Sequence, residues 1–85
     1  MTLYKFNKLN LTQQLMVLEL QGTRLDILTK GPYQIALFQI GAFYVEAYYA
    51  QDSIKVEKLH AFSGTGKLKP YLEKIDIRML LLDIL

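Results

Sequence analysis

A stretch of seventeen residues in the middle of the chain, from Tyr33 to Tyr49, carries a single charge, at Glu46, among many aromatic and β-branched side chains. These side chains suit the pleated surface of a β-sheet. One strand of this length would span about 55 Å, at about 3.3 Å per residue, whereas strands usually contain about 3–10 residues. We therefore expect Gly41 to divide the stretch into a hairpin. Both alternating faces of that hairpin are apolar, so the sheet has two surfaces to cover.

The length of the chain limits how well it can cover them. Its 85 residues are expected to form a single domain, residues 1–85, and a chain this short buries only about 60–65% of the surface that it exposes when unfolded. Hydrophobic residues make up 52% of it, slightly above the usual ~45–50%. Self-association is the simplest way to hide the excess, and symmetric dimers are the commonest soluble oligomers, so we predict a homodimer.

Charge and composition exclude several classes of protein. The net charge is only +2, and the ten basic residues are scattered, which argues against a surface that follows nucleic-acid phosphates. The absence of cysteine excludes disulfides and thiolate metal sites, and with a single histidine we predict no metal and no cofactor. The N-terminal residues do not resemble a signal peptide, and no segment is suited to span a membrane. The sequence predicts a cytoplasmic protein.

The first expected element is a helix near residues 12–21. Asn10 or Thr12 can cap its start, because the side-chain oxygen of either accepts a hydrogen bond from a free backbone N–H. Leu11, Leu15 and Leu18 fall on one stripe of this helix. Gly22 is predicted to end it in a left-handed conformation.

From Thr23 onward the hydrophobic period changes from about 3.6 to 2 residues, which predicts β-strands. Because proline is awkward at the second central position of a tight turn, we expect residues 30–33 to form a four-residue loop. Gly41-Ala42 suits a two-residue type II′ turn, which requires glycine first. The predicted strands are residues 23–30, 34–40 and 43–50.

These turns also predict the register of the strands. They place Ile40 opposite Phe43, Phe38 opposite Val45, Ala36 opposite both Ala47 and Ile27, and Leu25 opposite Phe38, so that one face of the sheet is wholly apolar. The opposite face then carries Tyr33, Ile35, Leu37, Gln39, Tyr44, Glu46 and Tyr48.

The C-terminal third leaves alternatives open. Residues 54–62 are expected to add a fourth strand, either with a bulge or with an early end near Glu57, because Ile54 and Val56 share a parity that Leu59 does not. Pro70 suits the first turn of a final helix, although residues 75–81 also fit a period of two. The apolar residues 77–85 are expected to form a last helical turn docked on their own core, with packing against a second subunit as the main alternative.

The predicted fold class is therefore α+β. It is an antiparallel three- to four-stranded meander with an N-terminal and a C-terminal helix packed on one face, that of Leu25, Phe38 and Val45. The element order is α-β-β-β-(β)-α.

Two motifs are weaker than they first look. Residues 63–67, Ser-Gly-Thr-Gly-Lys, lack the preceding glycine and the following Ser or Thr of a phosphate-binding loop, because Ala61 and Leu68 occupy those positions. We interpret them as a linker, with Lys67 and Lys69 as possible contacts to another anion.

His60, with Asp52 or Glu57 to orient it and Ser63 nearby, could act as a general base, but we favour a packed or surface histidine.

Aromatic residues raise a nucleic-acid alternative. Six tyrosines and four phenylalanines could stack on bases, and the α-β-β-β-α order resembles that of the double-stranded RNA-binding domain. That resemblance is limited to topology, because Lys67, Lys69 and Lys74 are a thin version of the family's lysine cluster. Tyrosines on a sheet more commonly pack at interfaces.

Several strings together resemble a family of small bacterial proteins with no assigned activity. They are Gln21-Gly22-Thr23 at the helix end, Phe43-Tyr44-Val45-Glu46 in a strand and Pro70-Tyr71-Leu72. The resemblance covers most of residues 5–77 and leaves out the apolar tail. It implies a compact α+β fold and a bacterial cytoplasmic origin, and it brings no cofactor or catalytic residue.

The sequence thus predicts a non-enzymatic interaction module that self-associates. Its expected interface is either the tyrosine-rich sheet face or the C-terminal tail. The candidate residues are Tyr33, Ile35, Leu37, Tyr44 and Tyr48 on the sheet and Met79 and Leu82 in the tail. The alternative is a nucleic-acid or small-ligand binder that uses aromatic stacking together with Lys67 and Lys69.

Overall fold

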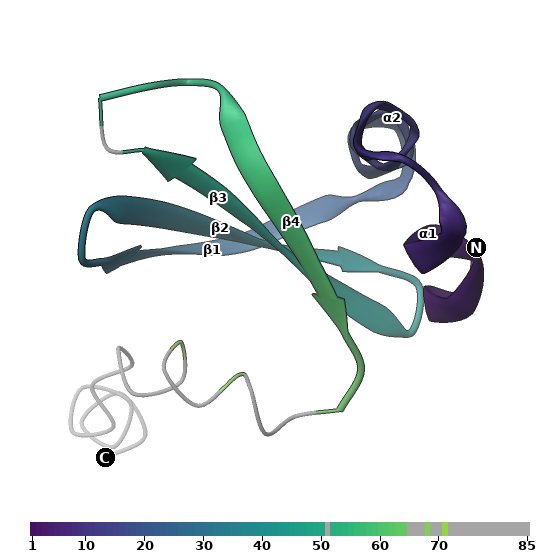
Figure 1. The fold of residues 1–85 in the computed structure, drawn as a ribbon. Helices are drawn as coiled ribbons and strands as arrows, with labels where there is room; N and C mark the ends of the chain where they lie inside the picture. The colour runs from purple at the N-terminus through teal and green to yellow at the C-terminus, as the bar shows by residue number, and fades with distance from the viewer. Residues whose placement is uncertain (51, 65–67, 69–70, 72–85) are drawn as a thin grey trace, which may run out of the picture.

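The computed structural model describes residues 1–50, 52–64, 68 and 71. Two helices precede a four-stranded antiparallel sheet whose strands lie in sequence order (Figure 1). The α+β class and the meander are therefore as predicted. The elements are α1 (Leu3–Lys8), α2 (Leu11–Gln21), β1 (Thr23–Lys30), β2 (Tyr33–Ile40), β3 (Phe43–Ala50) and β4 (Val56–Phe62).

Capping interactions fix both helices. In α2 the Asn10 side chain accepts a hydrogen bond from the Gln13 backbone N–H, and the Gln13 side chain accepts one from the Asn10 N–H, which forms a capping box. The short helix α1 was not predicted from the sequence. It starts at a Thr2 cap and is held by the fully buried ring of Phe6, which lies 5.5 Å from the ring of Phe43. Tertiary packing, rather than helix propensity, accounts for a helix of this length.

Gly22 ends α2, but not in the left-handed conformation that we predicted. Its φ and ψ are −80° and 141°, which is extended backbone open to any residue. Glycine is required here because there is no room for a side chain. A Cβ atom at this position would lie 2.5 Å from the carbonyl oxygen of Leu18. The close approach lets the chain turn directly from α2 into β1.

The central hairpin has the predicted register. Ile40 pairs with Phe43, Phe38 with Val45 and Ala36 with Ala47. Gly41 has a φ of 56° whereas Ala42 has no positive φ, as a type II′ turn requires.

The connection between β1 and β2 differs from the prediction. Lys30 pairs with Tyr33, so Gly31-Pro32 is a two-residue turn rather than part of a four-residue loop. Gly31 takes a φ of 59°, and the second central residue of a type II′ turn needs a φ near about −80°, which the proline ring permits.

A bulge in β1 corrects a second pairing. Arg24 rather than Leu25 pairs with Phe38, because the register shifts between Arg24 and Asp26. Ile27 still pairs with Ala36, as predicted. Bulges re-aim side chains, and this one places Arg24 on the otherwise apolar face of the sheet.

The fourth strand also contains a bulge, which is one of the two alternatives that its pattern allowed. Tyr48 pairs with Lys58 and Tyr49 with Val56, so Glu57 is the extra residue. The extra residue brings Val56 and Leu59 to the same face despite their different parity, and both pack on the main core.

The sheet has two apolar faces, as expected. The helix-side face is the one that α1 and α2 cover, and its core consists of Phe6, Leu18, Ala36, Ile40, Phe43, Val45 and Ala47. The tyrosine face is the opposite one and carries Tyr33, Ile35, Leu37, Tyr44, Glu46 and Tyr48, with a second core of Leu37, Phe62 and Tyr71.

The predicted C-terminal helix lies outside the described residues, except for Tyr71. This residue packs on the tyrosine face, not on the helix-side face where the whole helix was expected. Met79, Leu82, Lys67 and Lys69 also lie outside the described residues.

Substitution of Gly22 tests the tight turn. Replacing glycine by alanine at a negative φ usually stabilises a protein by about 0.4–1 kcal/mol. We expect Gly22→Ala to lower the free energy of unfolding instead, because the added Cβ would clash with backbone of Leu18. Urea denaturation measures the change, with Gln21→Ala as a control expected to stay within about 0.5 kcal/mol of the wild type. A stabilised Gly22→Ala would contradict the close approach.

Candidate functional site

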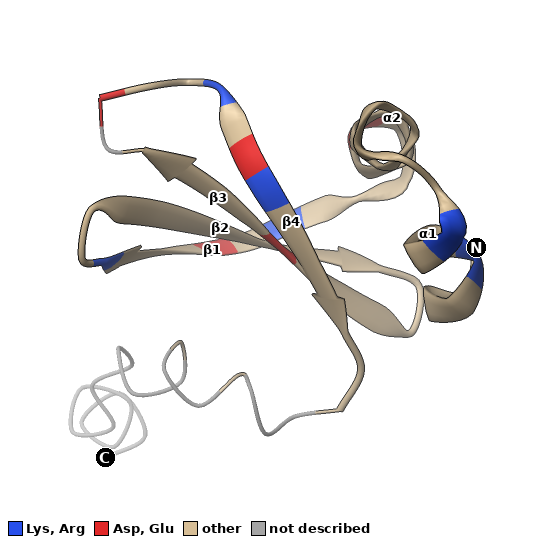
Figure 2. Ribbon diagram, viewed as in Figure 1, with Lys and Arg blue, Asp and Glu red and all other residues tan. Residues whose placement is uncertain are grey.

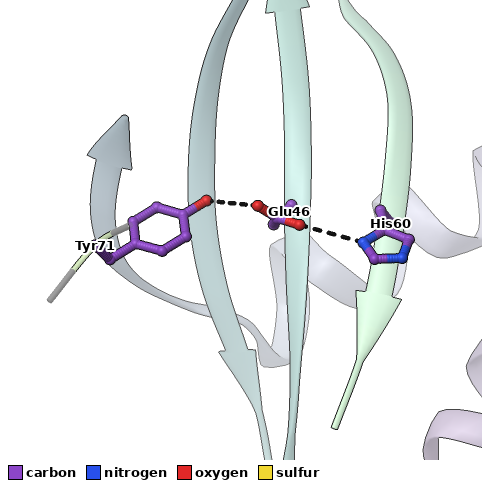
Figure 3. Close-up of polar contacts among 3 residues, drawn as sticks. All are labelled: Glu46, His60 and Tyr71. Carbon is purple, nitrogen blue, oxygen red and sulfur yellow. Dashed lines mark hydrogen bonds and ion pairs between the residues drawn. The ribbon is translucent and has the colours of Figure 1, made fainter. Parts of the chain in front are cut away.

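A buried carboxylate organises the tyrosine face. Glu46 is 9% exposed, and its two oxygens have different partners (Figure 3). The hydroxyl of Tyr71 donates a hydrogen bond of 2.8 Å to Oε2, and Nδ1 of His60 lies 3.2 Å from Oε1. We call these three residues the Glu46 cluster. It joins β3, β4 and the chain beyond β4 at one point.

The register of the sheet explains the contact between Glu46 and His60. Glu46 and His60 are directly paired across β3 and β4, so both side chains project from the same face at neighbouring positions. A carboxylate that is ionised only accepts hydrogen bonds, so this pairing requires a hydrogen on Nδ1 of His60. The ring of His60 also stacks on Phe62, with the centroids 5.7 Å apart.

Burial dominates the electrostatics of the tyrosines near this carboxylate. It raises the pKa of Tyr71 well above its usual value, and the hydrogen bond to Glu46 and the negative charges of Glu46 and Asp26 act in the same direction. Burial and the charge of Glu46 likewise raise the pKa of Tyr48. Both phenols therefore stay protonated at neutral pH, and Tyr71 acts as a donor.

The Glu46 cluster was not found from the sequence. His60 does have a carboxylate within hydrogen-bond reach, but that carboxylate is Glu46 rather than Asp52 or Glu57. Glu46 was placed on the tyrosine face, and the pairing with His60 required the bulge at Glu57, which the strand pattern left open. Tyr71 lies 25 residues away, and no local pattern signals that contact.

The sequence-predicted interface residues are largely packed within one chain. Ile35 and Leu37 are only 1% and 3% exposed. The rings of Tyr33 and Tyr48 meet edge to face at 5.8 Å, with Nζ of Lys58 4.5 Å from the centre of the Tyr48 ring, while Tyr44 stacks on Phe62 at 5.6 Å. The tyrosine face therefore offers less free apolar surface than the sequence predicted.

The helix-side face, in contrast, contains an apolar groove. Two adjoining pockets of about 230 and 320 Å³ share Phe38 and Tyr49 as lining residues. Their other lining residues come from α2, β1, β2, β4 and the connection before β4. They are Leu15, Leu18, Glu19, Arg24, Ile27, Gln34, Ala36, Ser53, Ile54 and Val56.

The groove exists because the helices cover only part of this face. Both pack near the Ile40–Phe43 end of the hairpin, and α2 buries only Leu18. The strands continue past the helices, so Ile27 remains 41% exposed and Ile54 is 98% exposed. The sequence predicted that this whole face is core, since the pattern of a strand does not reveal how far a short helix reaches along it.

Two charged side chains border the groove. Glu19 comes from α2, and Arg24 is placed there by the bulge in β1. No ion pair is found for either side chain in the described part of the chain. Among the described residues, the lysines and arginines are distributed over α1, β1, β4 and the connection before β4 (Figure 2).

The two pockets and the Glu46 cluster are separate. The two pockets lie on the face opposite the Glu46 cluster, and the side chain of His60 is 43% exposed. Within residues 1–50 and 52–64 and at positions 68 and 71, no three His, Asp or Glu residues are grouped as a metal site requires. No helix in this same part of the chain is long and apolar enough to cross a membrane.

Comparisons with known proteins identify no relative. The chain matches no protein-family model, no curated protein sequence and no solved structure.

Removal of the Tyr71 hydroxyl tests the Glu46 cluster. We expect Tyr71→Phe to lower the free energy of unfolding by about 1.5–3 kcal/mol, the usual range for a hydrogen bond to a charged group. Urea denaturation with circular dichroism measures the loss. Tyr4→Phe is the matched control, because Tyr4 is an exposed residue of α1 and should not change stability. Equal stability of the two variants would contradict the buried contact.

Alkaline pH provides an independent test. A tyrosine whose pKa is raised by folding contributes its full stabilisation below the unfolded pKa of about 10, and that contribution decreases as pH rises beyond it. The stability difference between the wild type and Tyr71→Phe should therefore be constant near neutral pH and shrink above about pH 10. Urea denaturation at several pH values measures it, and a difference that grows with alkalinity would contradict the assignment.

Proposed function

We propose that the protein is a non-enzymatic interaction module that forms a homodimer through its helix-side groove. The observation that carries this proposal is the pair of adjoining apolar pockets beside the exposed side chains of Ile27 and Ile54. Contiguous exposed apolar surface marks interaction sites on soluble proteins. The bacterial cytoplasm, which the family resemblance implies, is the proposed setting.

The area that a dimer requires is available on a chain of this size. A standard interface buries about 800 Å² on each partner, which is about one eighth of the 6318 Å² surface of the chain. Burial of apolar area contributes about 25 cal/mol per Å², and the loss of translational and rotational freedom offsets much of this gain. The exposed apolar residues on the helix side must therefore be well packed in the dimer, and the groove provides a concave surface for such packing.

The observations support the alternatives less well. A nucleic-acid or ligand site on the tyrosine face would need free aromatic rings, but Tyr33, Tyr44 and Tyr48 already pack against Lys58, Phe62 and one another. An enzyme centred on His60 would need a substrate pocket beside it, whereas the two pockets open on the other face. Self-association through the helix side needs neither feature.

Charges placed in the groove test the proposal. We expect the wild type to be dimeric at micromolar concentration, and Ile27→Lys combined with Ile54→Lys to be monomeric, because each lysine would carry a charge into the contact. Sedimentation equilibrium measures the mass, and circular dichroism confirms folding. Leu20→Lys, on the outer side of α2 and 80% exposed, is the matched control and should remain dimeric. A monomeric wild type would refute the proposed function.

A further inference from the structure

We infer that the occupant of the helix-side groove is residues 78–83 of a second copy of the chain. The inference rests on the proposed function and specifies which part of the partner the groove receives. Residues 78–83 read Arg-Met-Leu-Leu-Leu-Asp, so four apolar side chains lie between two opposite charges. The segment is too apolar to remain fully in water on a soluble chain, and it includes Met79 and Leu82 of the sequence-predicted interface.

The charges of the groove complement those of the segment. Glu19 borders the pocket beside α2, and Arg24 borders the pocket beside β1, and the two pockets meet at Phe38 and Tyr49. The segment carries Arg78 before its apolar residues and Asp83 after them. Pairing of Arg78 with Glu19 and of Asp83 with Arg24 sets one direction for the segment and leaves the four apolar side chains for the pockets. Paired charges of this kind fix register and direction at an interface.

The proposed homodimer favours a second copy over the same chain. Tyr71 is held on the tyrosine face by Glu46 of β3, whereas the groove lies on the opposite face. Two copies that meet at the helix-side groove bring the segment of each close to the groove of the other, whereas a segment in the groove of its own chain would block that interface.

Reciprocal exchange gives a closed assembly. If each copy places residues 78–83 in the groove of the other, both grooves are filled and a two-fold axis relates the partners. The closed dimer leaves no free groove and no free segment to recruit a third copy. Exchange also explains how a chain with a small core covers apolar surface on both faces of its sheet.

A complementation experiment with two full-length variants tests this exchange. The groove variant carries Ile27→Lys and Ile54→Lys, and the tail variant carries Met79→Lys and Leu82→Lys. Each should be monomeric alone, because one lacks a groove and the other lacks a segment that fits it. Mixed in equal amounts, they should form a heterodimer with one tail in one groove, which native mass spectrometry distinguishes from either homodimer.

A charge exchange tests the direction of the segment. Arg24→Glu and Asp83→Arg, each introduced alone, should weaken the dimer by about tenfold in dissociation constant, and the two together should restore most of the affinity. Asp76→Arg is the matched control, because it lies before the proposed segment and should not affect the dimer. Sedimentation at several concentrations measures the dissociation constants.

The outcomes separate the inference from the proposed function. A tail variant that remains a dimer while the groove variant is monomeric would overturn the exchange and leave dimerisation through the groove intact. Failure of the two variants to form a heterodimer, although each is folded, would overturn the exchange as well. A wild type that is monomeric at every concentration would instead refute the proposed function itself.

Discussion

The structure depends on one constraint, which is that the hairpin of β2 and β3 is apolar on both faces. Ile40, Phe43 and Val45 point to the helix side, while Ile35 and Leu37 point to the other side, and all five are buried. An antiparallel sheet usually leaves one face to the solvent and alternates apolar with polar residues. This sheet does not, so two separate layers are required from a chain of only 85 residues. The arrangement of the remaining elements follows from this requirement.

The two layers are built in different ways. On the helix side, α1 and α2 contribute Phe6 and Leu18 to the core and leave a groove where they end. On the tyrosine face, the described part of the chain beyond β4 contributes Leu68 and Tyr71, and Tyr71 both packs on Leu37 and donates to Glu46. One face is thus closed by a directional hydrogen bond, whereas the other is closed only in part by apolar contacts without fixed direction. This difference is why the helix side is the better candidate for a partner.

The sequence predicted those features that local chemistry controls. The period-two pattern and the Gly41-Ala42 turn were enough for the register of β2 and β3, because a two-residue turn leaves no freedom in the pairing. Asn10, the N-cap of α2, was one of the two predicted caps, because capping also depends on residues close in sequence. Features that depend on contacts between distant residues were missed or wrong, namely the short helix α1, the bulge that brings Arg24 to the helix side and the contact of Tyr71 with Glu46. The tight Gly31-Pro32 turn was missed because proline was taken to be awkward at the second central position of a tight turn, whereas the φ that a type II′ turn needs there is one that proline permits.

Glu46 illustrates why a polar residue is found in the middle of an apolar face. Burial of a carboxylate is costly, and the cost is offset only when its oxygens are hydrogen-bonded, as both oxygens are here. An apolar residue at this position would make the tyrosine face more uniform, and many arrangements of the following chain would then bury similar area. The two oxygens of Glu46 instead favour one arrangement, with His60 on one side and Tyr71 on the other. The position of Tyr71 on the tyrosine face is therefore set by hydrogen-bond geometry rather than by hydrophobic burial alone.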